Sequence, residues 1–157
     1  MLKNTRVISI GIVASFLAVM LVNFLYHCQL MGGVYQANMS LFRDTETAKD
    51  YYPISMLATF LLVSMSTLIF TKGYEKKGYL EGFRFGLLIA FILCSQTLLG
   101  FAYSPIYSNF IDIWLIGNLL EGVVIGLTLA AVFAMKLDDE KAPKKTKPAK
   151  AKKNKKK

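Results

Sequence analysis

Long apolar stretches alternate with shorter polar segments along the whole chain. The apolar stretches cover about residues 7–26, 53–71, 83–103 and 111–135. About 20 apolar residues in helical form cross the roughly 30 Å of hydrocarbon in a bilayer. We therefore predict an all-α protein, in which residues 1–137 form a four-transmembrane-helix bundle built from two antiparallel hairpins.

The polar segments between these stretches differ in kind. Residues 29–50 form the longest loop, which opens with the flexible pair Gly32–Gly33 and carries Asp44 in a position to cap a short helix. The segment 104–110 contains a proline and is so short that the third and fourth spans must run antiparallel. Residues 72–82 mix charged side chains with three glycines, so this loop is either flexible or closely packed.

The composition fits a membrane protein and leaves little room for anything else. Hydrophobic residues make up 54% of the 157 residues, which exceeds the 45–50% of a typical soluble domain. A chain of this length accommodates one domain, so a separate catalytic module is excluded. The first apolar stretch is too long for a signal peptide and lacks a small-residue cleavage site, so we predict an uncleaved span.

The charges predict an orientation. The net charge is +9, but ten lysines lie between Lys141 and Lys157, and residues 1–140 sum to 9 − 10 = −1. Seventeen Lys and Arg residues fall on one side of the predicted spans and two on the other. Basic residues near span ends stay in the cytoplasm, so we expect a multi-pass membrane protein with both termini cytoplasmic. At the outer boundary of the membrane, aromatic residues are expected to anchor the helix ends among the lipid headgroups: Tyr26, Tyr51, Tyr52, Tyr103, Tyr107 and Trp114.

Residues 138–157 are predicted to form a disordered, lysine-rich cytoplasmic tail, because they contain too little apolar surface to form a core. Lysines near a membrane attract anionic lipid headgroups by about 1 kcal/mol each. The lysines expected to make this contact are Lys144, Lys145, Lys147, Lys150, Lys152 and Lys153. Alternatively, the tail binds nucleic acid or an acidic protein, or it serves only as a topology signal without a partner. No aromatic residue is interleaved for base stacking, so specific RNA recognition is not expected.

Small residues recur every fourth position in the last two spans. They are Gly82, Gly86, Ala90 and Cys94 in the third, and Gly122, Gly126, Ala130 and Ala134 in the fourth. Such stripes lie on one helix face and let backbones approach closely in lipid. We expect the two stripes to face each other within the hairpin; a homodimer contact through one of them is the alternative.

One carboxylate lies near the middle of the membrane. Glu121 is about ten residues into the fourth span, or roughly 15 Å deep at 1.5 Å per residue. An ionised carboxylate is costly there, so we expect Glu121 to face the interior, find partners and carry a proton. Polar residues at similar depth predict a shared layer: Asn118, Gln96, Ser95, Ser64 and Asn23. This layer is either a titratable or ligand-binding centre, or a hydrogen-bonded pin in which Glu121 donates to Gln96 or Asn118.

The remaining reactive side chains give no further site. Cys28 and Cys94 are too far apart for a redox pair or a metal cluster, and we expect both to be packing residues. His27 is the single histidine and lies at a span end, where it meets the headgroups or, alternatively, titrates or binds a metal. With no nucleophile–base pair or phosphate loop, we predict a protein without enzymatic activity, cofactor or metal.

Several short segments resemble a known group of proteins. Residues 70–78 and 81–89, with Gly33-Val34-Tyr35 and the run Gly117–Glu121, are similar to those of small bacterial four-helix membrane proteins. The resemblance covers roughly residues 20–135; it implies the fold and a bacterial inner membrane, and no activity. We therefore expect an accessory or structural membrane protein with a membrane-protein partner or a second copy. The alternative is a small proton-coupled transporter or carrier that works as an oligomer around Glu121.

Overall fold

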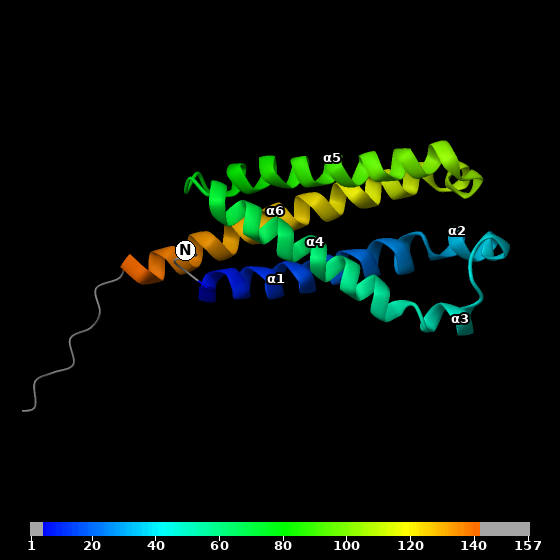
Figure 1. Cartoon of the computed structure of the whole chain (residues 1–157), viewed down its shortest axis with the longest axis horizontal. Helices are drawn as coiled ribbons and strands as arrows, with labels where there is room; N and C mark the ends of the chain where they lie inside the picture. Colours follow the sequence, from blue (N-terminus) through cyan, green and yellow to red (C-terminus); the bar gives the residue numbers. More distant parts are fainter. Residues whose placement is uncertain (1–4, 142–157) are drawn as a thin grey trace, which may run out of the picture.

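The computed structural model describes residues 5–141, and within this range it is helical and contains no strand. Its long helices are α1 (Thr5–Asn23), α4 (Tyr52–Gly73), α5 (Tyr79–Tyr103) and α6 (Ile111–Lys141) (Figure 1). The chain thus has four helical segments long and apolar enough to cross a membrane. The predicted all-α fold with four membrane-spanning helices is confirmed.

The first span is longer than predicted because α1 continues as a π-helical segment, Phe24–Leu30. The whole span runs from Thr5 to Leu30. Within the π-helical segment Tyr26 is buried, and its hydroxyl donates to the carbonyl of Ile113 at 3.0 Å. Tyr26 therefore joins the first span to α6, and its predicted role as a headgroup anchor is wrong.

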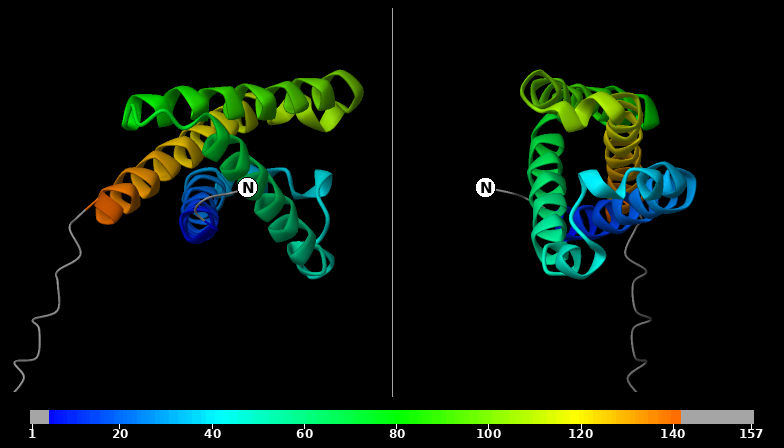
Figure 2. Two further views of the ribbon diagram at one scale, coloured as in Figure 1. Left: turned by 60° about the vertical axis from the view of Figure 1, so that its left-hand side comes forward. Right: turned by 90° about the vertical axis from the view of Figure 1, so that its right-hand side faces the viewer.

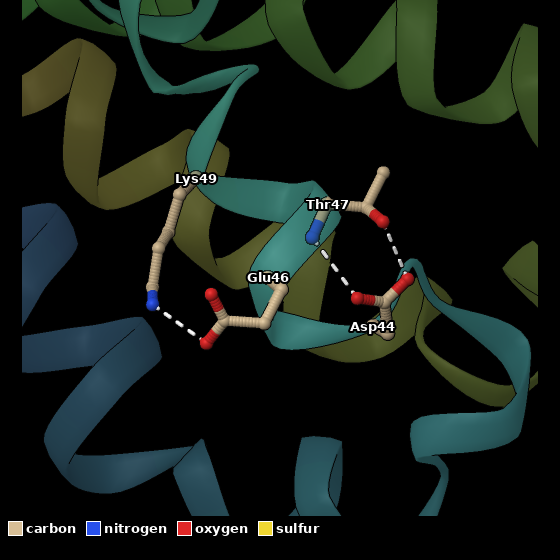
Figure 3. Close-up of polar contacts among 4 residues, drawn as sticks. All are labelled: Asp44, Glu46, Thr47 and Lys49. Carbon is tan, nitrogen blue, oxygen red and sulfur yellow. Dashed lines mark hydrogen bonds and ion pairs between the residues drawn. The ribbon is translucent and has the colours of Figure 1, made fainter.

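The segment after this span is more ordered than its glycines suggest. Gly32 and Gly33 begin a short helix, α2 (Gly32–Ala37), instead of forming a flexible joint. After α2, the chain forms a 3₁₀ turn, Met39–Leu41, and then α3 (Thr45–Lys49). The predicted cap of α3 is confirmed: the Asp44 carboxylate accepts a hydrogen bond from the Thr47 backbone N–H at 2.9 Å (Figure 3).

The long helices form two antiparallel hairpins, as predicted. One consists of α1 and α4, and the other of α5 and α6, which are joined by the 3₁₀ turn Pro105–Asn109. The α6 helix packs along α5 on one side and against α1 on the other, while α4 crosses obliquely and contacts mainly α1 (Figures 1 and 2). Since α6 touches the other three long helices, its side chains decide what lies inside the bundle.

The small-residue stripes bring α5 and α6 together, which confirms packing within the hairpin. A Cβ added to Gly86 would lie 2.6 Å from the carbonyl oxygen of Gly122, and one added to Gly122 would lie 2.5 Å from the backbone nitrogen of Ala90. Gly82 makes the same kind of approach to Gly126 and Ala130. The stripe is buried in this contact, so it is not open to a second copy in this arrangement.

The α4–α5 loop is held in place by one side chain. Glu81, in the first turn of α5, accepts hydrogen bonds from the backbone N–H groups of Glu75 at 2.6 Å and Lys77 at 2.8 Å. Gly78 has a φ of 72°, which glycine adopts at little cost. The loop is thus hydrogen-bonded but mostly exposed: a Cβ added to Gly73 or Gly78 would meet no atom within 4 Å, and only Gly82 is closely packed.

Helix α6 extends to Lys141, beyond the predicted bundle boundary at residue 137. The sequence offers no glycine or proline between Met135 and Lys141 that would end a helix, and the first proline follows at Pro143. The remaining tail, residues 142–157, lies outside the described residues. The lysines predicted to contact lipid all belong to it, so that prediction stays untested.

Candidate functional site: an interhelical polar pocket

Glu121 pairs with the first span. Its carboxyl group lies within interaction range of the side chain of Asn23, the last residue of α1. Both side chains are half-buried. The pair links α6 to α1 at the depth where the sequence placed the polar layer, but its partner is Asn23 and not Gln96 or Asn118.

Asn118 forms a separate link in the opposite direction. Its amide Nδ2 donates to the Thr97 hydroxyl of α5 at 2.7 Å. Asn118 is three residues before Glu121, so the two side chains lie on neighbouring parts of the α6 surface. Within about one turn, α6 thus meets α5 through Asn118 and α1 through Glu121.

The other predicted members of the polar layer lie elsewhere. Ser95 and Gln96 are exposed on α5, and the Ser95 hydroxyl donates to the carbonyl of Ile92 in its own helix. Ser64, on α4, has a buried hydroxyl oxygen without a hydrogen-bond partner among the described residues. The single layer shared by four helices is therefore wrong. These residues were predicted from their depth in the membrane alone. Each step along a helix also turns the side chain by about 100°, so residues at one depth can face different sides.

Asn118 and Thr97 line a pocket together with two aromatic side chains, His27 and Trp114. The pocket has a volume of about 350 Å³. Its walls come from the π-helical end of the first span, from α5 and from the first two turns of α6. Its lining residues lie within about two turns of the ends of α5 and α6. These helix ends are at the same end of the bundle as α2 and α3 (Figure 1).

Tyr35 of α2 supports the aromatic wall of the pocket. Its hydroxyl accepts a hydrogen bond from Trp114 Nε1 at 3.1 Å and lies 2.8 Å from His27 Nδ1. Burial raises the pKa of this hydroxyl, although the bond from Trp114 acts in the opposite direction, so Tyr35 remains a neutral phenol at pH 7. Phe110, which directly precedes α6, stacks on Trp114 with ring centroids 5.5 Å apart and closes the cluster.

Gly117 makes room for the histidine. An added Cβ would lie 3.1 Å from His27 Nε2 and 3.2 Å from Tyr26 Cε1, both tighter than ordinary contacts. The imidazole therefore lies against the bare backbone of α6, next to Asn118. His27 is half-buried between Tyr26 and Tyr35. The prediction that His27 simply meets the lipid headgroups is therefore wrong.

Sequence reasoning missed Thr97 and Tyr35. Thr97 could have been found, because it follows Cys94 by three residues and so continues the small-residue face of α5 toward α6. Tyr35 gave no signal, since its role depends on how α2 folds back over the helix ends. The cysteines differ from each other: Cys94 Sγ lies 3.7 Å from the carbonyl oxygen of Leu115 in the packed hairpin, whereas Cys28 is exposed and is not a packing residue.

Residues 5–141 contain no group of three or more His, Cys, Asp or Glu side chains placed to hold a metal ion. Comparison with known proteins adds no assignment. No protein-family model matches the chain, and neither the curated proteins nor the solved structures contain a match.

Proposed function

We propose that this chain is a non-enzymatic accessory protein of the bacterial inner membrane, which holds or stabilises a membrane-protein partner. The observation that carries the proposal is the use of the polar side chains inside the helices. Glu121 faces Asn23 of α1, and Asn118 is hydrogen-bonded to Thr97 of α5, so each joins α6 to a neighbouring helix. Such pairs favour a rigid bundle over a continuous polar path through it.

The environment of His27 supports the absence of enzymatic activity. Its ring nitrogen pairs with the phenol of Tyr35 and not with a serine or cysteine that it could activate as a nucleophile. The hydroxyls of Thr67, Thr71 and Ser95 donate to backbone carbonyls of their own helices. These groups stabilise helices in the arrangement seen here.

The charge distribution supports the orientation that belongs to this proposal. The loop containing Lys76 and Lys77 and the C-terminal end of α6 lie at one end of the bundle, and α2 and α3 at the other (Figure 1). The excess of basic residues at the first end favours a cytoplasmic position for it. The tail lysines would then face anionic headgroups of the inner leaflet. The resemblance to small bacterial four-helix proteins fits the same location.

The proposal is tested with the Glu121→Gln variant, compared with Glu121→Leu. A glutamine side chain offers Asn23 a polar neighbour of the same size, whereas leucine offers it none. Interhelical hydrogen bonds in membranes contribute roughly 0.5–2 kcal/mol. We expect Glu121→Gln to keep the wild-type melting temperature in detergent and Glu121→Leu to lower it.

Native mass spectrometry of the full chain, released gently from its own membranes, then separates the two functions. An accessory protein should appear in a stoichiometric complex with another membrane protein, and this complex should survive Glu121→Gln. The carrier alternative requires Glu121 to change its protonation state. A homo-oligomer whose transported ion or solute is lost in Glu121→Gln would contradict the accessory role and favour the carrier.

A further inference from the structure

The pocket lined by His27, Thr97, Trp114 and Asn118 is not explained by an accessory role. The hydrogen bond between Asn118 and Thr97 links two helices, but it does not require an open space beside it. At about 350 Å³, the pocket lies within the roughly 300–1,000 Å³ range of small-molecule sites. Three separate segments contribute its walls, so its shape depends on the assembled fold.

The groups around the pocket are mainly hydrogen-bond donors. Trp114 Nε1 can only donate, so the Tyr35 hydroxyl accepts that bond and has its own hydrogen available for His27 Nδ1. When the Tyr35 hydroxyl donates that hydrogen to Nδ1, the proton of the neutral imidazole is on Nε2, beside Gly117. The second hydrogen of the Asn118 amide and the hydrogen of the Thr97 hydroxyl are not used in the bond between these two residues.

These donors select the ligand's chemistry. None of the four lining side chains carries a formal charge when His27 is neutral, so a charged ligand would lose its hydration without gaining a counter-charge. N–H and O–H groups match an acceptor such as a carbonyl oxygen. His27, Thr97 and Trp114 all lie in membrane-spanning segments, so the ligand is one that dissolves in the bilayer.

We propose that this pocket binds the carbonyl end of an uncharged, membrane-dissolved molecule, with His27, Thr97 and Asn118 as hydrogen-bond donors and Trp114 as a wall. Two kinds of bilayer component carry such a group: the ring carbonyls of a quinone and the ester carbonyl of a glycerolipid. Both present the same acceptor, and the experiment distinguishes them. The inference does not depend on whether the chain has a protein partner.

Trp114 is the only tryptophan of the chain, so its fluorescence reports directly on the pocket. The purified full-length protein in detergent is titrated separately with a short-chain ubiquinone and with a short-chain diacylglycerol. We expect one probe to change the emission saturably, by quenching for the quinone and by a wavelength shift for the diacylglycerol. The probe that saturates identifies the source of the carbonyl group.

Thr97→Val removes the hydroxyl while keeping the shape, and Gln96→Leu is the matched control on the exposed face of α5. Because one hydrogen bond contributes modestly, we expect Thr97→Val to weaken binding about threefold to tenfold and Gln96→Leu to leave it unchanged. Circular dichroism checks that each variant is folded. A wild-type response that rises linearly without saturation for both probes overturns the proposal, as does equal weakening by Thr97→Val and Gln96→Leu.

Discussion

At the scale of single residues, the polar side chains of this protein act mostly by satisfying backbone groups or one another. Asp44 shows this most simply. Its carboxylate accepts hydrogen bonds from the backbone N–H of Thr47 at 2.9 Å and from the Thr47 hydroxyl at 2.6 Å (Figure 3). A cap of this kind fixes where a helix begins, because the first N–H groups have no partner within the helix.

The Asp44 cap should make α3 dependent on pH. The hydrogen bond from the Thr47 side chain, followed by the one from its backbone, lowers the pKa of Asp44 below its usual value of 3.8. Since the folded-state pKa is lowered, the stabilisation is fully present above the unfolded-state pKa and is lost as the pH falls through the folded-state pKa. We expect hydrogen exchange at the Thr47 amide, corrected for the intrinsic rate, to be slow near neutral pH and to accelerate below about pH 4.

Two variants test whether the Asp44 carboxylate causes the pH dependence of exchange at Thr47. Asp44→Asn keeps a side-chain oxygen that accepts the bond but does not titrate, so Thr47 should stay protected throughout this pH range. Asp44→Ala should leave Thr47 unprotected at every pH. Unchanged protection in Asp44→Ala would mean that α3 is held by its neighbours and not by its cap.

At the scale of elements, a sequence pattern predicted contacts correctly where it fixed the direction of side chains around their helix. A pattern that fixed only their depth in the membrane did not. The spacing of four placed Gly86 and Gly122 on defined faces, and the structure packs those faces together. The polar layer was built from depth alone, so it included Gln96 and missed its neighbour Thr97. The π-helical end of the first span has no such signature. It changes which residues share a face and places Tyr26 against α6.

The contact between α5 and α6 should not tolerate even a methyl group. In Gly122→Ala, the new Cβ would lie 2.5 Å from the backbone nitrogen of Ala90, and a backbone cannot move aside as a flexible side chain can. Overpacking of this kind costs roughly 1–3 kcal/mol. We expect a clearly lower melting temperature in detergent, followed by circular dichroism.

Gly33→Ala is the matched control for this change. Gly33 lies in α2, and an added Cβ there would meet no atom within 4 Å. Alanine also favours helix over glycine by up to about 1 kcal/mol, so this variant should melt at the wild-type temperature or above it. If Gly122→Ala melted like the control, the two helices would not pack as closely as the glycine stripes require.

At the scale of the whole molecule, the two ends of the bundle have different chemistry. The α2–α3 end covers the polar pocket with an aromatic cluster around Tyr35. At the other end, Phe70, Tyr74 and Phe133 pack rings against one another beside the basic α4–α5 loop. The pocket therefore lies near one membrane face only, and the orientation of the chain decides which leaflet could supply its ligand.

Cysteine labelling in intact cells measures this orientation. In a chain with Cys28→Ser and Cys94→Ser, one new cysteine is placed at Ser40→Cys, at the α2–α3 end, or at Lys76→Cys, in the α4–α5 loop; both native side chains are exposed. Basic residues are retained in the cytoplasm, so a membrane-impermeant maleimide should label the Ser40→Cys chain in intact cells and the Lys76→Cys chain only after permeabilisation. Labelling of Lys76→Cys in intact cells would reverse the orientation. It would also place the pocket in the cytoplasmic leaflet, where its ligand would have to come from the lipids and quinones of that side.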